Sequence, residues 1–486
     1  MLQVNAGPRN SCMTRMPISY SEDELPITHG QISDFAEDAV SCMRRLWTTH
    51  GDVAALQEGS ERIHFVFGPH YTKQILSDSQ RFHSHFFAMR GPRKSAQRRV
   101  TSGLLTMNGD THKQHRRTVM GPFQKRAISA YHDTIVQMAG DFLKDWKPGE
   151  TKDLAAEMTH YMLQLTSSIL FGIDMPELAF KVGELTERWV ALNHEVGPSA
   201  FSPALRQPEL YDRLLSSAEE LEVAVKEMVR IRRSGKLGFD VLSLLMRAHE
   251  ADGGISDEEL IGHIVLLFGA AHLTSAHTLN WTLFLLAQHP DIMARLYREL
   301  QGNLGGRAPQ PEDIDNLPYL ERVLKESMRV LPASAYSQRI AAESVELGPF
   351  QLHRGDIVLF SQFMTHHLPA LYDHPEQFLP DRWETITPSP YAYLPFGAGP
   401  RMCIGAALGT MQLKISLIMI LNHLKISMVR NSEVNARVMS TMLFPSSTVP
   451  IRLSAHDGQF ESQSITGTIH SLVHLPTQAK ATIRAA

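Results

Sequence analysis

The chain has 486 residues, 43% of them hydrophobic and 20% charged, with a formal net charge of −4. These are the proportions of a globular protein with a large apolar core, and they exclude a general attraction to nucleic acid or to anionic lipid. Its three cysteines, Cys12, Cys42 and Cys403, are widely spaced without a CxxC pair, which argues against a disulfide framework or a zinc site and favours a reducing cytoplasm.

Composition divides the chain into three parts. Residues 1–40 contain charged residues and no continuous apolar run, so we expect an N-terminal extension without a secretion signal or a membrane anchor. Residues 41–455 show no linker-like stretch and are expected to form a single domain. Residues 456–486 are polar and irregular, which is typical of a loosely ordered C-terminal tail.

Helical periodicity dominates the domain, whereas strand-like alternation is short and mostly late in the chain. The pattern predicts helices over 110–132, 153–171, 208–234, 256–289, 291–304, 319–331 and 404–424. It predicts strands over 62–67, 337–352, 356–360 and 449–453. The expected fold class is therefore mainly α with a small β subdomain.

The helix over 256–289 is the longest and is expected to lie at the centre of the fold. Ser256 and Glu259 form a capping-box pattern at its start, and Pro290 ends it. At about 1.5 Å per residue it would be about 50 Å long, enough to cross the domain. It has no charged residue from 260 to 287, but its histidines and other polar residues would be costly in lipid, so we expect no membrane span.

The stretch PFGAGPRMCIGAALG, residues 395–409, places Cys403 among glycines directly before an apolar helix. Unpaired N–H groups and the positive end of the helix dipole stabilise a thiolate, the form that binds metal or attacks a substrate. Only Arg401, and no histidine base, lies close upstream, so an iron ligand is a stronger interpretation than a nucleophile. A buried cysteine without chemistry is the remaining alternative.

Residues 396–405, FGAGPRMCIG, resemble the haem-binding loop of the cytochrome P450 family, because every fixed position of F-G-x-G-x-R-x-C-x-G is met. The resemblance extends from about residue 51 to residue 453. It implies a cytochrome P450-like fold around a buried haem b (iron protoporphyrin IX), with Cys403 as the axial thiolate. It also implies that Phe396 packs near the sulfur, that Gly397 and Gly405 make room for the porphyrin, and that Arg401 pairs with a haem propionate.

Two further segments match helices of the family. In LKESMR, Glu326 and Arg329 lie on one helical face, and they resemble the ExxR pair whose third member, Arg382, comes from FLPDRW. The resemblance implies a structural cluster that holds the cysteine loop.

In HKQHRR, His112 and Arg116 lie one helical turn apart. The resemblance implies that His112 and Arg116 both bind the haem propionates, together with Arg339 from AYSQRIA.

The central helix carries GAAHLTS, residues 269–275, which resembles the family's oxygen-binding motif but departs from it. Thr274 matches the threonine that assists proton delivery, whereas Leu273 replaces the usual acid. General acid assistance typically contributes about 10²–10⁴-fold to a rate, so the replacement is a large change. His272, a bound water or the substrate would have to supply the protons, unless the chemistry differs.

The resemblance implies an oxidoreductase that activates O₂ and monooxygenates a hydrophobic small molecule. It also implies electrons from a separate ferredoxin- or flavodoxin-type protein, for which the basic side chains of 113–126 form a candidate docking face. Leu273 keeps a peroxygenase or an isomerase-like enzyme open, and a haem carrier or sensor without turnover is a third hypothesis. By family position, the substrate pocket is expected to include Phe86, Phe87, Leu104, Phe268, Ala270, Ala333, Leu443 and Phe444.

Overall fold

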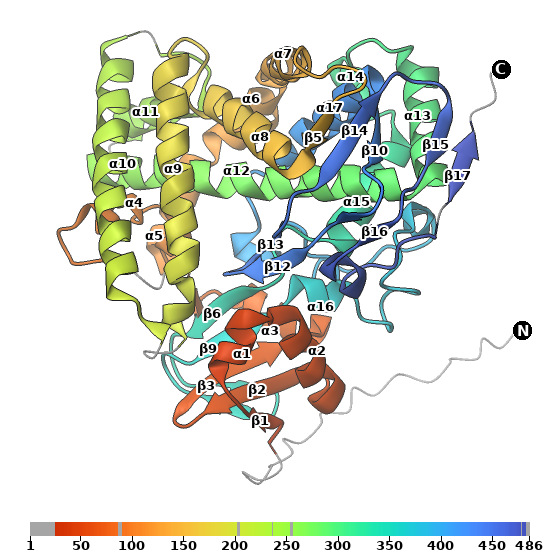
Figure 1. The fold of residues 1–486 in the computed structure, drawn as a ribbon. Helices are drawn as coiled ribbons and strands as arrows, with labels where there is room; N and C mark the ends of the chain where they lie inside the picture. Colours follow the sequence, from red (N-terminus) through yellow and green to blue (C-terminus); the bar gives the residue numbers. More distant parts are fainter. Residues whose placement is uncertain are drawn as a thin grey trace, which may run out of the picture.

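One long helix, α12 (Asp257–Gln288), runs through the middle of the molecule, and other helices pack around it (Figure 1). The computed structural model describes residues 25–85, 90–201, 205–235, 237–252, 256–477 and 479–482. The helix begins at the expected capping box, where the Glu259 N–H donates to Ser256 Oγ (3.3 Å) and the Ser256 N–H donates to the Glu259 carboxylate (2.8 Å).

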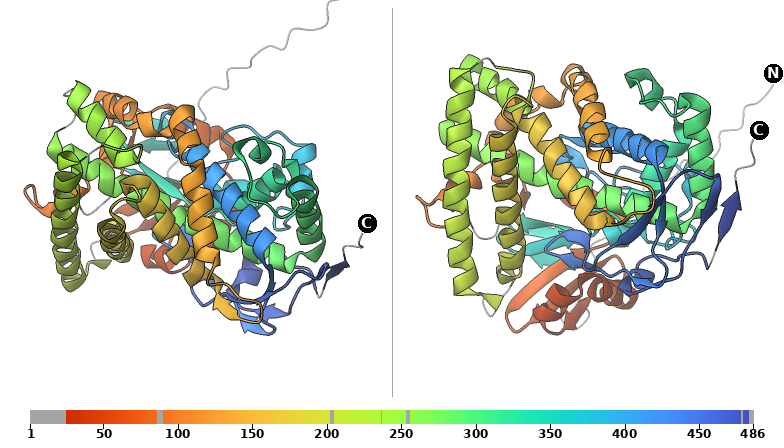
Figure 2. Two further views of the ribbon diagram at one scale, coloured as in Figure 1. Left: turned by 90° about the horizontal axis from the view of Figure 1, so that it is seen from above. Right: turned by 45° about the horizontal axis from the view of Figure 1, so that its top comes forward.

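Helices make up most of the fold. Those before α12 are α1 (Ile32–Glu37), α2 (Ala39–His50), α3 (Pro69–Ser77), α4 (Ala96–Val100), α5 (Gly109–Val119), α6 (Lys125–Ala130), α7 (His132–Leu143), α8 (Leu154–Phe171), α9 (Pro176–Val196), α10 (Pro208–Ser234) and α11 (Val241–Asp252). Those after it are α13 (Pro290–Leu304), α14 (Pro311–Ile314), α15 (Pro318–Val330), α16 (Gln362–His366) and α17 (Ala406–His423). Figure 2 shows α9 and α10 side by side along one edge and α13 along the opposite edge.

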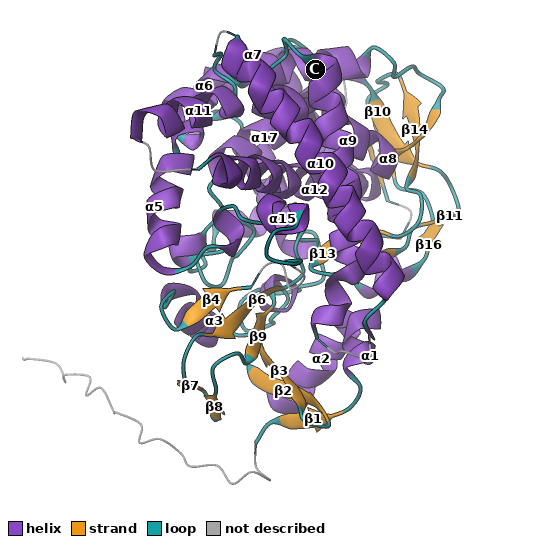
Figure 3. Ribbon diagram, turned by 90° about the vertical axis from the view of Figure 1, so that its left-hand side faces the viewer, coloured by secondary structure: helices purple, strands orange, loops and turns teal. Residues whose placement is uncertain are grey.

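The strands form one sheet of six and several smaller ones, and the larger sheet lies below the helices in Figure 3. Its order is β1 (Ile27–His29), β2 (Val53–Glu58), β3 (Glu61–Val66), β9 (Ile357–Phe360), β6 (Ser337–Ala341) and β4 (Phe82–Ser84). A second sheet joins β10 (Lys425–Met428), β14 (Pro450–Ser454) and β5 (Thr151–Asp153). The remaining strands pair in twos: β7 (Val345–Leu347) with β8 (Phe350–Leu352), β11 (Ser432–Glu433) with β16 (Ile465–Thr466), β12 (Ala436–Met439) with β13 (Met442–Pro445), and β15 (Gln459–Glu461) with β17 (Lys480–Thr482).

Two expected elements are divided in the structure. The helix expected over 110–132 is broken into α5, a 3₁₀ turn at Gly121–Phe123, α6 and the start of α7. Pro122 lacks a backbone N–H, so an α-helix could not continue through it without losing a hydrogen bond. The strand expected over 337–352 is three strands, because the chain reverses between β7 and β8 at Gly348, whose φ is 58°.

The folded structure extends beyond both expected boundaries of the domain. On the N-terminal side, β1 pairs with β2 and Ile32 and Phe35 are fully buried, so residues 27–40 belong to the sheet and the core. On the C-terminal side, the expected loose tail forms β15, β16 and β17 and buries Ile469 and Val473. The few apolar residues of this C-terminal segment are enough to hold it in place, because they pack against the rest of the domain.

Within the described residues, α12 is the one helix long and apolar enough to cross a membrane by length and composition. However, 67% of its most apolar window is buried inside the protein. The other helices therefore cover the apolar surface that lipid would cover around a membrane-spanning helix.

Candidate cofactor and active site

The loop that carries Cys403 is held in shape by its own backbone. The Cys403 N–H donates to the Phe396 carbonyl (2.9 Å), and the Met402 N–H donates to the Gly399 carbonyl (3.0 Å). Gly399 has a φ of 73°, and a Cβ there would lie 2.3 Å from the Leu76 carbonyl oxygen of α3, so no other residue fits without movement. The chain then enters α17, which puts Cys403 directly before that helix, as the sequence predicts.

The Cys403 side chain is accessible to solvent although protein surrounds it on most sides. This burial raises the pKa of the thiol, while the Gly405 backbone N–H and the Arg116 guanidinium act in the opposite direction. A metal cation on the sulfur would favour the thiolate far more strongly than these groups do. In the same loop, a Cβ on Gly397 would meet nothing within 4 Å, so the space beside this part of the backbone is open.

Four cationic or titratable side chains from three segments of the chain converge near this loop. Burial and, after it, nearby positive charge lower the pKa of His112 to about 4 and the pKa values of Arg339 and Arg401 to about 10 each. Burial lowers the pKa of Arg116 as well. Among the described residues no carboxylate forms an ion pair with any of the three arginines, so the cluster carries positive charge that protein does not neutralise.

Hydrogen bonds of two of these side chains join the cysteine loop to α5 or to the residues just before it. Arg116 donates to the Met402 carbonyl (2.7 Å), and Arg401 donates to Asn108 Oδ1 (2.6 Å) and to the Met107 carbonyl. The buried Nε of Arg401 has no partner within the described chain. A planar group with two carboxylates would satisfy both the unpaired donors and the unpaired charge, so the residues present fit a haem.

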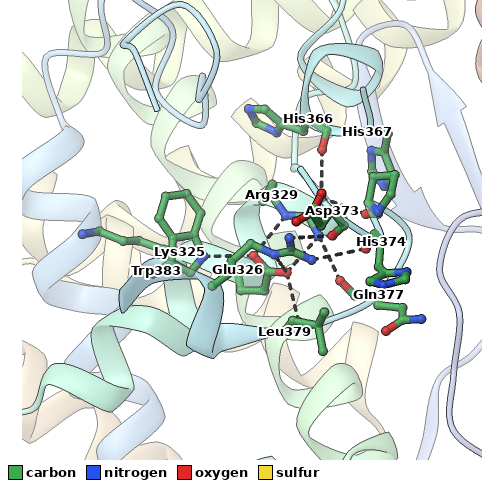
Figure 4. Close-up of polar contacts among 12 residues, drawn as sticks. Lys325, Glu326, Arg329, His366, His367, Asp373, His374, Gln377, Leu379 and Trp383 are labelled. Atoms are coloured by element: carbon green, nitrogen blue, oxygen red, sulfur yellow. Dashed lines mark hydrogen bonds and ion pairs between the residues drawn. The ribbon is translucent and has the colours of Figure 1, made fainter. Parts of the chain in front are cut away.

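The predicted Glu326–Arg329–Arg382 contacts are present (Figure 4). Glu326 and Arg329 are fully buried and form a bidentate ion pair at 2.8 and 3.0 Å, and Arg382 Nε donates to Glu326 at 3.0 Å. Arg329 satisfies its other donors on three carbonyl groups at 2.8–2.9 Å, those of His366, Pro375 and Gln377. The cluster thereby ties α15 to the segment that leads into the cysteine loop.

The central helix has one stripe that the protein leaves partly accessible. Ala270 is exposed, and Leu267, Thr274 and His277 are half-buried, at spacings that put all four on one helical face. The Thr274 hydroxyl donates to the Ala270 carbonyl (2.7 Å). Leu273 is half-buried and packs against the main core at the flank of this stripe.

Three expected site residues do not lie on that stripe. His272 is buried on the opposite face, where Nε2 donates to the Thr159 carbonyl (3.1 Å), so it does not reach the Thr274 hydroxyl. Phe268 also faces away and stacks on Phe171 of α8 with ring centroids 5.7 Å apart. Leu443 is fully buried on the core side of β13, where its carbonyl accepts from the Trp281 indole (3.1 Å).

The other residues expected in the substrate pocket differ in how far they are buried. Phe444 and Ala333 are half-buried, and the Phe444 ring lies 6.2 Å from the His277 ring. Leu104 is buried, and its N–H donates to His263 Nδ1 (3.2 Å). Phe86 and Phe87 lie outside the described residues.

Several residues at the site were not singled out from the sequence. Trp383 donates to Glu326 (2.9 Å) and directly follows Arg382, so its place in FLPDRW was an available signal. Asn108 bonds Arg401 from another part of the chain, and no local pattern announces that contact. His277 lies three residues after Thr274, and helical spacing alone would have placed it on the same face.

Comparisons with known proteins agree with this geometry. The family model described as Cytochrome P450 matches residues 27–453. The chain is 30% identical over 370 residues to a cyclooctat-9-en-7-ol 5-monooxygenase of Streptomyces melanosporofaciens, covering 74% of this chain and 79% of that protein. It is 25% identical to a pentalenene oxygenase of Streptomyces avermitilis, covering 82% and 89%. A solved structure, retinoic acid bound cyanobacterial CYP120A1, superposes with a TM-score of 0.76 at 20% identity over 90% of this chain and 99% of that one.

Proposed function

The chain belongs to the cytochrome P450 family, and from this premise we propose that it is a haem-thiolate monooxygenase of a terpenoid-like substrate. Membership makes it an enzyme that binds haem and uses O₂, a hydrophobic small molecule and redox partners. The names of its relatives, an oxygenase of pentalenene and a monooxygenase of cyclooctat-9-en-7-ol, support a terpenoid skeleton. The observation that carries the proposal is an accessible Cys403 thiol beside a positively charged cluster that no described carboxylate neutralises.

In this proposal each group of residues has one task. Cys403 holds the iron, and Gly397 and Gly405 leave space beside it. His112, Arg116, Arg339 and Arg401 bind the two propionates, where planar guanidinium groups suit carboxylates. Phe396 limits access of water to the sulfur. The haem supplies the redox chemistry that inserts one atom of O₂ into the substrate.

The chain's own residues must then deliver protons without an acid at position 273. Thr274 is the candidate, because its hydroxyl lies on the accessible stripe and its lone pairs can accept from a water. His272 is not suited to this task, since its ring donates to the Thr159 carbonyl on the other side of the helix. We therefore assign proton delivery to Thr274 and water.

Electrons would come from a separate acidic protein of the ferredoxin or flavodoxin type. Lys125 and Arg126 are exposed on α6, and Arg117 is exposed on the neighbouring α5. These side chains would steer such a partner to the side of the molecule that carries the cysteine loop. We also propose a cytoplasmic location, which the few, widely spaced cysteines support.

A peroxide-driven reaction is the second candidate, and Leu273 favours it. Peroxide already carries the two electrons and two protons that O₂ would have to receive, so no net proton has to be delivered past position 273. Turnover with hydrogen peroxide, but none with O₂ and a reducing partner, would select this alternative.

The proposal is tested by the optical spectrum of the reduced, carbon monoxide-treated protein and by isotope labelling. We expect the spectrum of a thiolate-ligated haem in the natural protein and in Cys42→Ser, and its loss in Cys403→Ser. With labelled O₂ and an electron donor, one labelled atom should enter a terpenoid product. A colourless protein after haem supply, or an unchanged spectrum in Cys403→Ser, would overturn the assignment.

A further inference from the structure

Two histidines, one beyond Thr274 on the accessible stripe of α12 and one on α9, have no task in the chemistry above. His277 is one helical turn from Thr274 on α12, half-buried, with the Phe444 ring beside it. His194 is near the end of α9, also half-buried, and close enough to His277 that its charge would affect that ring. The two rings therefore come from different helices to one place.

Neither ring forms a hydrogen bond with any described residue, and their nitrogens are not among the buried unpaired atoms, so the two half-buried rings are open to a ligand. Several other histidines of this chain are tied to the protein instead, such as His272 to Thr159 and His289 to Leu285. A ligand bound there removes water from the rings, and a polar group that loses water without gaining a partner costs free energy. A ligand that hydrogen-bonds both rings would avoid this cost.

The charge state of the two rings limits the kinds of ligand group that they can bind. Burial lowers the pKa of His194 to about 4 and that of His277 to about 3, so both rings are neutral at neutral pH. A neutral imidazole has one donor nitrogen and one acceptor nitrogen. Two neutral rings suit a hydroxyl, which donates and accepts, better than a carboxylate, which would favour charged rings.

We propose that His194 and His277 bind a hydroxyl group of the substrate, so that the natural substrate is a hydrophobic skeleton that already carries an alcohol. This inference rests on the proposed function, because it concerns the substrate of that same site. The hydroxyl would anchor one end of the molecule one helical turn from Thr274 and leave an apolar carbon next to the reacting centre. The reaction that supplies the substrate is then an earlier hydroxylation or a cyclisation that ends with water.

The test compares binding of matched terpenoids to the haem-loaded protein by substrate-induced spectral shifts. The probes are cedrane, cedrol and cedryl methyl ether, with menthane and menthol as a smaller pair. We expect each alcohol to bind about tenfold more tightly than its parent hydrocarbon, the ratio that about 1.4 kcal/mol represents, and the ether to lie between.

Substitutions of the two histidines test whether these rings cause the preference for alcohols. His277→Phe and His194→Phe should each remove most of the preference for alcohols while cedrane binding is kept, and His277→Gln should retain part of it because an amide also donates and accepts. His160→Phe, at an exposed position on α8, is the matched control and should change nothing. Two separate phenylalanine variants are used so that the test still holds if one of them fails to fold.

Two outcomes overturn the inference. The first is that the alcohols bind no more tightly than their hydrocarbons, or do not bind at all. The second is that the preference for alcohols survives in both phenylalanine variants. The carbon monoxide spectrum separates this failure from failure of the proposed function, since it depends on Cys403 and not on either histidine.

Discussion

At the scale of single residues, Glu326 lies at the centre of the buried charge cluster. It accepts from Arg329, Arg382, Trp383 and the Leu379 backbone while fully buried. Such a cluster contributes little net stability when intact, because desolvation of the charges offsets their attraction. It is costly to break, since each missing charge leaves another one unpaired in the core.

Glu326→Gln should therefore lower the free energy of unfolding by about 3–5 kcal/mol and reduce haem retention. Urea unfolding and the ratio of haem to protein absorbance measure the two effects. Glu227→Gln, which removes an exposed partner of Arg230, is the control and should leave both nearly unchanged. Equal stability of the two variants would contradict the structural role of the cluster.

Thr274 offers a prediction about chemistry instead of stability. Thr274→Ala removes the one hydroxyl that we assign to proton delivery, so reducing equivalents should be lost to peroxide and water. We expect product formed per electron pair to fall about tenfold or more, within the range of general acid effects. Thr274→Ser keeps the hydroxyl and should stay close to the natural protein. Unchanged coupling in Thr274→Ala would remove the residue from the proton path.

Motif residues such as Cys403 and the Glu326 cluster could be predicted because fixed spacing defines them. The side on which a helical residue faces could not be read with the same certainty. His272, Phe268 and Leu443 were expected at the site, but the first two side chains turn toward partners distant in sequence, Thr159 and Phe171, and Leu443 is fully buried in the core. Only the packing of α8 and β13 on α12 decides these directions.

At the scale of elements, α5 and α6 combine two surfaces. The inner face of α5 carries buried His112 and the half-buried Arg116, while Arg117 on α5 and Lys125 and Arg126 on α6 point to solvent. A partner that docks on the outer side would be separated from the cysteine loop only by these short helices. In the proposed arrangement, electron transfer and haem binding would share this pair of elements.

Charge reversal on this outer side should slow reduction by an acidic redox protein. Lys125→Glu with Arg126→Glu should lower the rate of the first electron transfer about tenfold or more at low salt, with a smaller effect at high salt where charges are screened. Stopped-flow reduction under carbon monoxide measures this rate. Lys181→Glu with Arg213→Glu, exposed on α9 and α10, makes the same change in net charge and should have little effect. Equal slowing by both pairs would show that net charge, and not this face, matters.

Elements with clear caps or strong periodicity could be predicted closely, including α8, α10, α12 and α15. The break of 110–132 could have been foreseen from Pro122, but its apolar spacing continues across the proline. Helices α2 and α9 and most of the short C-terminal strands were not predicted. Their few apolar residues are specified by the surfaces they meet, and those surfaces come from remote parts of the chain.

At the scale of the whole molecule, the interior holds an unusual number of neutral histidines. Burial lowers the pKa of His64 and His272 to about 4 and that of His366 to about 3. The His366 ring must stay neutral in the fold, because its Nε2 accepts from the Leu394 N–H (2.7 Å). These rings are protonated much more readily in the unfolded chain than in the folded one.

Stability should therefore decline at mildly acidic pH. Each of the three rings gains a proton on unfolding once the pH is below about 6.5, so its contribution is fully present above that pH and is lost as pH falls toward 4. The expected loss is about 1.4 kcal/mol per group for each pH unit. Urea unfolding between about pH 8 and about pH 5 measures the slope, and His64→Gln should reduce it by one group. A flat profile over this range would contradict the neutral state of these rings.

The C-terminal segment reaches back to the segment that supplies carbonyl groups to Arg329. The His474 N–H donates to the Glu376 carbonyl (2.9 Å), and Gln377 forms a bridge with His474. Proteins begin to fold from the N-terminus while translation proceeds. The chain must therefore be synthesised past residue 474 before this contact can form, so the segment that accepts from Arg329 is fastened late in translation.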